Sequence, residues 1–212
     1  MYLIDESYFT NKLYIANINE PNTDLNDEVN SYIEDKVRLF LDNCLGLDLF
    51  EELDSFIVDG ILIDTAPLKW KNLVNGCKYI NNGTNYRFKG LLQTNGGIKK
   101  SLLANYTFYH WLEDNVTQQS GIGEVVTNGK NAINANSTQR LTSVWNEFVT
   151  LNQEGNLNYP IAYRKGCTKV VDWLGNANSA NVSLITFLQH NQEDYKGFQG
   201  AKYEYKNQIG FK

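Results

Sequence analysis

A stripe of apolar side chains near the N-terminus is the strongest structural signal in this chain of 212 residues. The stripe runs, at spacings of three and four, through Leu25, Val29, Ile33, Val37, Phe40, Leu41 and Cys44. This spacing places the side chains on one face of a helix, and Asp24 ahead of it can cap the first turn. The sequence therefore predicts a helix of about twenty residues, roughly 30 Å long, that buries one face against other elements.

Five further segments carry apolar residues at helical spacing. They are residues 49–57, 68–74, 98–115, 137–155 and 182–192. The segment 98–115 is apolar over a wide face, which is typical of a helix at the centre of a fold. Together with the first helix, these segments predict a mainly α fold: a helical bundle of three long and several short helices with β-hairpin or loop excursions and extended termini.

Two excursions interrupt the helical pattern. Residues 78–90 hold Asn82-Gly83 between aromatic runs, which is a signal for a type I′ hairpin. Residues 117–136 are polar and predict a long loop or protruding hairpin, a length that is often functional. The single domain then divides into an N-terminal arm (1–23), a helical core with both excursions (24–155) and a C-terminal segment with a short helix and an aromatic tail (156–212). Two readings of the arm stay open: extended pieces, or a strand that packs on the core.

Composition narrows the class of protein. Hydrophobic residues make up 42% and charged residues 20%, as in globular proteins. The net charge of −5 argues against a nucleic-acid-binding surface, which needs a basic patch. The apolar runs are far shorter than the ~20 residues of a membrane span, and we expect no secretory signal because no basic region precedes an apolar stretch. Three widely spaced cysteines predict free thiols in a reducing compartment.

Motifs that carry chemistry are scarce. The cysteines and the two histidines, His110 and His190, show no metal-binding spacing, and no Gly-rich segment ends in the Gly-Lys-Ser/Thr of a phosphate-binding loop. We therefore predict no catalytic, cofactor-binding or metal-binding residues and no enzymatic activity. The alternative is a small cytosolic enzyme with a site assembled from scattered residues, for which His110, Glu113 and Asp114 are the first candidates.

Aromatic residues point to interfaces instead. The chain has 13 Tyr, 10 Phe and 4 Trp, and Tyr and Trp are enriched where proteins meet. Three segments, 2–18, 117–136 and 198–212, carry apolar residues without a period of their own; each either folds back on the core or crosses to another subunit. We favour intersubunit contacts, made by Val125, Val126, Ile133, Phe198, Tyr203, Tyr205 and Phe211.

A series of motifs follows in a recognisable order. A long helix with Tyr32-Ile33-Glu34 and Phe40-Leu41 ends in a Leu-Gly step, Leu45-Gly46-Leu47-Asp48-Leu49-Phe50. Then come Lys69-Trp70-Lys71-Asn72-Leu73-Val74-Asn75-Gly76, Tyr79 and Phe88-Lys89-Gly90-Leu91. The aromatic helix Tyr106 to Asn115, the Gly/Ser/Thr loop, Val144-Trp145-Asn146-Glu147 and the ending Asn207-Gln208-Ile209-Gly210-Phe211 complete the series. In this order the chain resembles head–tail connector (neck ring) proteins of tailed phages of Bacteroidetes, including crAss-like phages. It departs from them in lacking Gly at Lys12-Leu13-Tyr14 and in having Cys77.

The resemblance implies a structural virion protein. Such a subunit forms a ring of about a dozen copies below the portal through head-to-tail contacts; it extends and seals the DNA conduit and docks the tail. Its partners are copies of itself, the portal and the adjacent neck or tail ring proteins. DNA passes through the lumen without specific binding, eased by the negative charge of the subunit. The resemblance implies no cofactor, no membrane partner, assembly in the bacterial host cytoplasm and a final place in the virion. A tail-side ring, such as a tail terminator or hub adaptor, is the alternative within virions, and a host-encoded binding module is a further one.

Overall fold

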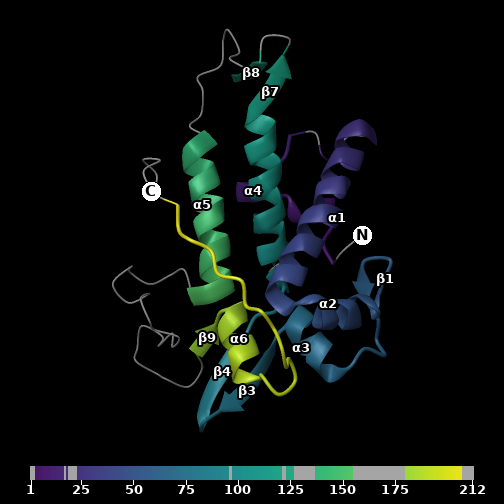
Figure 1. Cartoon of the computed structure of the whole chain (residues 1–212), viewed down its shortest axis with the longest axis vertical. Coiled ribbons are helices and arrows are strands. Elements are labelled where there is room, and N and C mark those ends of the chain that lie inside the picture. Colours follow the sequence, from purple (N-terminus) through teal and green to yellow (C-terminus); the bar gives the residue numbers. More distant parts are fainter. Residues whose placement is uncertain are drawn as a thin grey trace.

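Three helices lie side by side in the upper part of the molecule. The computed structural model describes residues 3–16, 18, 23–95, 97–120, 123–126, 137–154 and 180–206. Helix α4 (Leu102–Val116) lies between α1 (Thr23–Leu45) and α5 (Ser137–Val149) and packs against both, as Figure 1 shows. A short π-helix, η3 (Thr150–Glu154), continues α5. The helix predicted from the first apolar stripe is thus confirmed, and its residues Val29, Ile33 and Val37 are buried.

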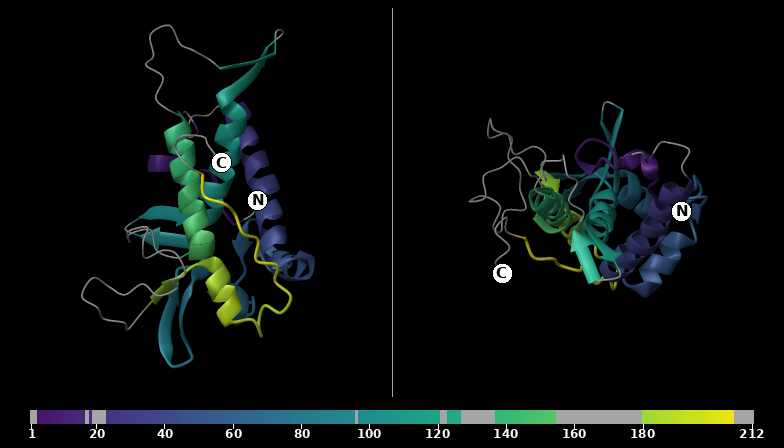
Figure 2. Two further views of the ribbon diagram at one scale, coloured as in Figure 1. Left: turned by 60° about the vertical axis from the view of Figure 1, so that its left-hand side comes forward. Right: turned by 90° about the horizontal axis from the view of Figure 1, so that it is seen from above.

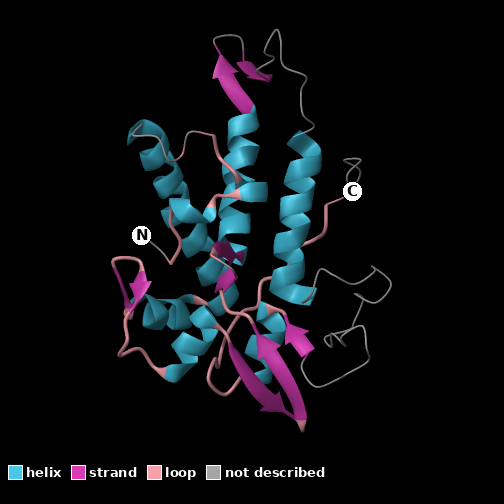
Figure 3. Ribbon diagram, turned by 180° about the vertical axis from the view of Figure 1, so that it is seen from behind, coloured by secondary structure: helices cyan, strands magenta, loops and turns pink. Residues whose placement is uncertain are grey.

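Shorter elements form the lower part. Helices α2 (Leu47–Asp54), α3 (Leu68–Asn75) and α6 (Leu184–His190) surround a sheet in the order β3-β4-β9. Strands β3 (Cys77–Asn81) and β4 (Thr84–Phe88) form the predicted hairpin, with Asn82 and Gly83 at positive φ in its turn. Strand β9 (Ala180–Val182) pairs with β4 in parallel. Figure 3 shows these strands gathered below the long helices.

Three further hairpins project from the body. They are β1 (Ile57–Val58) with β2 (Ile61–Leu62), β5 (Leu92–Asn95) with β6 (Ile98–Ser101), and β7 (Thr117–Ser120) with β8 (Gly123–Val126). Strand β7 continues directly from α4 and extends beyond the helices in Figure 1. In Figure 2, β5 and β6 point away from the helices. Within the range 117–136, the described part is therefore a protruding hairpin.

The predicted fold class, a helical bundle of three long helices, is wrong. Over the described residues the chain has six α-helices and nine short strands, a mixed α/β architecture. One cause is the segment 98–101, which was assigned to a helix because Ile98 and Leu102 are four residues apart. That spacing fits a strand equally well, and the structure ends a strand at Ser101, whose Oγ accepts a hydrogen bond from the N–H of Leu103 and so caps α4. A second cause is the β4–β9 pairing, which joins segments more than ninety residues apart.

The N-terminal arm packs on the core, although not as a strand. Two single turns of 3₁₀ helix, η1 (Glu6–Tyr8) and η2 (Asn11–Leu13), shape the segment. Its buried apolar side chains are Leu3, Ile4, Tyr8, Phe9, Leu13, Ile15 and Ile18. Arg140 on α5 donates hydrogen bonds to the carbonyl oxygens of Lys12 (3.0 Å) and Tyr14 (2.6 Å). The described part of the arm thus forms 3₁₀ turns in place of a strand, and its apolar side chains fold back on the core of their own protomer.

No helix among the described residues is long and apolar enough to cross a membrane.

Two glycines let the end of α3 meet the end of β4. Gly76 (φ 82°) and Gly90 (φ 89°) both have positive φ, and a Cβ on either would lie 2.5 Å from a backbone atom of the other segment. Any side chain would therefore both strain the backbone and separate the two segments. This close approach holds the base of the β3–β4 hairpin against the end of α3.

We predict that Gly76→Ala and Gly90→Ala each lower the free energy of unfolding by about 2–5 kcal/mol, the sum of backbone strain and overpacking. Gly83→Ala is the matched control: its φ is also positive (72°), but nothing lies within 4 Å of its Cβ position, so strain alone costs about 1–2 kcal/mol. Urea titrations of the three variants measure the difference. Equal losses at positions 76, 90 and 83 would contradict the close-approach argument.

Candidate functional site

Amide side chains of α5 and η3 hold the C-terminal segment. The Nδ2 of Asn146 donates to the carbonyl oxygen of Lys206 (2.8 Å), and its Oδ1 accepts from the Lys206 N–H (2.9 Å). Gln153 makes the same pair of bonds with Tyr203, at 2.8 and 2.9 Å. Each amide thus supplies the donor and acceptor that a neighbouring strand would otherwise provide. The segment 201–206 therefore lies along η3 and α5 in Figure 1.

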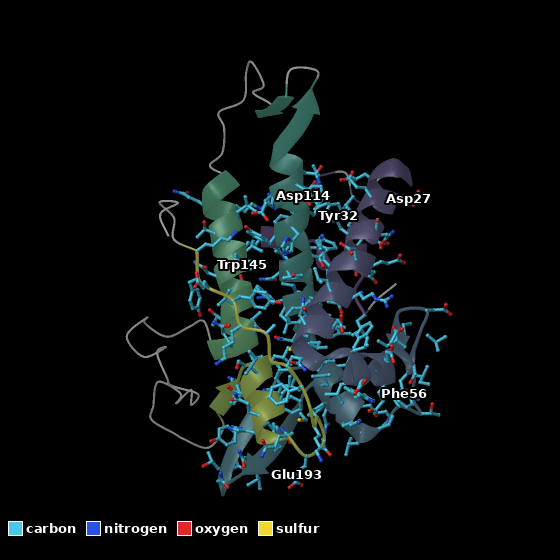
Figure 4. All side chains as sticks on the ribbon, viewed as in Figure 1. Asp27, Tyr32, Phe56, Asp114, Trp145 and Glu193 are labelled. Atoms are coloured by element: carbon cyan, nitrogen blue, oxygen red, sulfur yellow. The ribbon has the colours of Figure 1, made fainter. Side chains whose placement is uncertain are left out.

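Tyr203 fills the space that α4 and α5 leave between them. Its ring centroid lies 5.0 Å from that of Phe148, 5.7 Å from Trp145 and 6.0 Å from Tyr106. Trp145, labelled in Figure 4, also donates from Nε1 to the carbonyl oxygen of Glu204 (2.8 Å). Burial raises the pKa of the Tyr203 hydroxyl. The tail is thus part of the protomer's own aromatic core.

The seven predicted interface residues fall into three groups. Tyr203 and Phe198 pack against the core of their own protomer, and Tyr205 is 40% exposed while its hydroxyl is hydrogen-bonded to Thr150 Oγ1 (2.9 Å). Val125 and Val126 lie in β8 of the protruding hairpin. Ile133 and Phe211 lie outside the described residues. The structure therefore brings Tyr203 and Tyr205 to α5 and its extension and leaves Val125 and Val126 far from them.

The candidate residues of the enzymatic alternative are engaged in structural contacts. Glu113 Oε1 accepts from the Tyr109 hydroxyl (2.6 Å) and lies 3.6 Å from Lys206 Nζ, while His110 Nδ1 lies 3.8 Å from Glu113 Oε2. Asp114 instead accepts from the Tyr32 hydroxyl on α1 (3.0 Å), a contact seen in Figure 4. Burial raises the pKa of Glu113 and lowers that of His110. Two of the three candidates thus meet, and the third faces another helix.

The two cysteines that the structure describes, Cys44 and Cys77, are free thiols that fit a structural role. Cys44 is fully buried on the apolar face of α1, and burial raises its pKa to about 12. A thiol in such surroundings stays protonated and acts as a small apolar group. Cys77 is also free, and Cys167 lies outside the described residues. Within the described ranges, no group of three or more His, Cys, Asp or Glu side chains is placed to hold a metal ion.

A pocket of about 540 Å³ opens beside the β5–β6 hairpin. Its walls come from the N-terminal arm, β4, β6, the start of α4, α5 with η3, and β9. Buried apolar residues that line it are Leu13, Phe88, Leu102 and Val182. The volume lies in the range of ordinary ligand and docking sites. It is therefore a concave feature that could receive a ligand or part of another protein.

Four of the five charged residues that line this pocket are lysines. Lys12, Lys89, Lys99 and Lys100 face a single glutamate, Glu147. Lys12 pairs with Glu147 at 2.7 Å, and Lys99 lies 3.5 Å from Asp5. Among the described residues, no carboxylate pairs with Lys89 or Lys100. A protein with a net charge of −5 thus carries a cationic pocket with an apolar floor.

Motif-based reasoning missed these lysines, although the sequence holds a signal for them. Between residues 65 and 112 the chain has seven Lys or Arg residues and no Asp or Glu. Such a block is a charge-patterning signal, hidden here because the net charge of the whole chain is acidic. The folding of β4 and β6 onto the arm then brings three of these lysines together with Lys12.

No protein-family model, curated protein or solved structure matches the chain.

We predict that Asn146→Ala and Gln153→Ala detach the tail without unfolding the body. Each variant loses two hydrogen bonds, worth about 1 kcal/mol apiece, so backbone amides of residues 201–206 should exchange with solvent faster. Hydrogen–deuterium exchange with mass spectrometry measures this, and Gln139→Ala, an exposed residue of the same helix, is the control. Unchanged exchange in both variants would contradict the role of the amides.

The stability of the fold should fall as the pH drops from about 7 to 5. Burial lowers the pKa of both His110 and His190 from the ordinary value of 6.5. As the pH falls, the unfolded chain therefore takes up protons first, which lowers its free energy relative to that of the folded chain. The stabilisation is complete above pH 6.5 and is lost as the pH falls through the lower folded pKa.

Urea unfolding at several pH values tests this dependence. The double variant His110→Gln/His190→Gln should lose less stability over the same range than the unmodified chain, although Glu113, with its raised pKa, acts in the opposite sense in both. The single variant His190→Gln should fall between them. Parallel curves for all three proteins would show that these histidines do not set the dependence.

Proposed function

We propose that this chain is a structural subunit of the phage head–tail interface. It forms a ring below the portal, extends and seals the DNA conduit and docks the tail. The order of motifs that resembles neck ring proteins, from the Leu45-Gly46 step to Val144-Trp145-Asn146-Glu147, is one support. The chain works through surfaces that fit copies of itself and neighbouring rings, and it has no bond-making centre of its own.

The observation that carries the proposal is the exposure of branched aliphatic side chains on projecting hairpins. Val58 and Ile61 on β1–β2 are 54% and 70% exposed, Ile80 on β3 is 71% exposed and Ile98 on β6 is 44% exposed. Single exposed apolar residues are common on protein surfaces, but these four lie at or beside the ends of three separate hairpins. Hairpins that project such groups suit insertion between subunits, where burial removes them from water.

The arrangement of the protomer suits a ring. In a closed ring each subunit presents one surface and accepts a different one. In Figure 1 the β7–β8 hairpin projects at the top of the molecule and the β1–β2 hairpin at the right, so both can reach neighbours while the three helices serve as a rigid body. The negative net charge of the subunit favours passage of DNA without adhesion, since like charges repel.

Deletion of residues 117–136 tests the role of the protruding hairpin. We expect a folded protomer with unchanged stability that no longer assembles on its partner ring, because the described part of the deleted range, β7 and β8, lies beyond the end of α4. Co-sedimentation with purified portal measures the assembly, and the Gln139→Ala variant is the control. Retained assembly after the deletion would count against the proposal.

Mass spectrometry of purified virions, with copy number, tests the function as a whole. A ring subunit should occur at about a dozen copies per particle and bind portal directly. Binding only after another neck protein has been added would favour a tail-side ring instead. Absence from purified particles would overturn the proposed function.

A further inference from the structure

One stretch of the chain is acidic and apolar at once. Residues 47–66 carry six Asp or Glu and no Lys or Arg. Glu52 is paired with Lys69 (2.6 Å), and among the described residues no cation pairs with the other five. The acidic part of this stretch, from Asp48 to Asp64, immediately precedes the block of residues 65–112 that has seven basic residues and no acidic one. Two neighbouring parts of one chain thus carry opposite, largely uncompensated charge.

The hairpin β1–β2 turns the acidic stretch into a projecting knob, defined here as Val58, Asp59, Gly60 and Ile61. Asp59 (φ 50°) and Gly60 (φ 76°) form a two-residue turn of the type I′ class. Val58 and Ile61 are partners across the turn and therefore lie on the same face of the hairpin. The knob offers an exposed apolar pair with a carboxylate at its tip.

The pocket beside β5–β6 has the complementary chemistry. Its floor is apolar, with Phe88, Leu102 and Val182, and its polar lining includes Lys89 and Lys100, which have no carboxylate partner within the described residues. Burial of Val58 and Ile61 on that floor would remove apolar area from water, and Asp59 would meet unpaired ammonium groups. Its volume of about 540 Å³ is in the range that accepts several side chains.

The two features lie apart on the protomer. In Figure 1 the β1–β2 hairpin is on the right, and α5 and β9, which contribute to the pocket, are on the left. One protomer therefore cannot fill its own pocket with its own knob. A contact between different surfaces of identical chains is heterologous, and its repetition gives a ring or a filament.

We propose that the knob of one copy of this chain docks in the lysine-lined pocket of the next copy. This inference rests on the proposed function in needing self-assembly, and it names the two surfaces that meet. The contact places the carboxylate of Asp59 beside Lys89 and Lys100 and so offsets part of the positive charge of the pocket. Its opposite charges make association dependent on salt.

Two complementary variants test the contact. The knob variant Val58→Thr/Asp59→Asn/Ile61→Thr removes charge and apolar area but keeps residues suited to strands and to the positive φ of the turn. The pocket variant Lys89→Glu/Lys100→Glu reverses the charge of two exposed lysines. In sedimentation velocity the unmodified chain should form oligomers, and each variant alone should weaken association by about tenfold or more. The control is Lys78→Glu/Arg87→Glu on the neighbouring β3–β4 hairpin, which reverses two equally exposed cations outside the pocket and should associate like the unmodified chain.

Mixing the two variants gives the most discriminating result. The knob variant has an intact pocket and the pocket variant has an intact knob, so a 1:1 mixture should form dimers and stop there. Higher salt, about 0.5 M against 0.05 M, should weaken the dimer because it screens the charges. A mixture that stays monomeric, equal weakening by the control variant, or an unmodified chain that remains monomeric at about 1 mM would each overturn the inference.

Two further outcomes separate this inference from its rivals. If the pocket variant loses binding to duplex DNA at low salt while self-association is unchanged, the pocket is a phosphate site and the inference fails. If rings form and occur in virions although neither variant disturbs them, the proposed function stands and the docking contact is wrong. Dimers from the mixed variants together with absence from virions would leave the contact valid and overturn the function.

Discussion

The packing of α4 against α5 is the contact on which the rest of the protomer depends. Tyr106 on α4 and Trp145 and Phe148 on α5 form an aromatic seam, with ring centroids 5.0 to 6.3 Å apart. Phe40 of α1 and Tyr203 of the tail both join this seam, and their own ring centroids lie 6.3 Å apart. Buried aromatic rings provide much of the apolar area that stabilises a core. Segments from both ends of the chain are thus anchored on one pair of helices.

Helix α5 is the element that orders the two ends of the described chain. Arg140 holds the carbonyl oxygens of the N-terminal arm, and Asn146 and Gln153 hold the backbone of the tail. Because these bonds satisfy backbone groups in segments that form no strand, the segments can cover the core without a sheet partner. The surfaces left for other molecules are then the projecting hairpins and the pocket. The β1–β2 hairpin lies in an acidic stretch, whereas the pocket is lined by lysines.

Much of the secondary structure followed from the sequence, because its signals are local. The stripe from Leu25 to Cys44 predicted α1, and the pair Asn82-Gly83 predicted the β3–β4 turn. The fold class did not follow, since Ile98 and Leu102 fit a helix and a strand alike and since β9 pairs with a strand far away in the chain. The placement of Tyr203 also escaped prediction: an aromatic residue outside a periodic segment has the same sequence signal whether it covers its own core or a neighbour.

The sequence by itself determined where the helices run, where the tight turns fall and how charge is divided between residues 47–66 and 65–112. These properties depend on spacing, on backbone preferences and on the order of residues. Only the tertiary structure decided that Lys12 would join Lys89, Lys99 and Lys100 around one pocket, and that the β1–β2 hairpin would lie away from that pocket. The physical reason is that such neighbours are set by the packing of distant segments around the α4–α5 seam, for which no local pattern carries information.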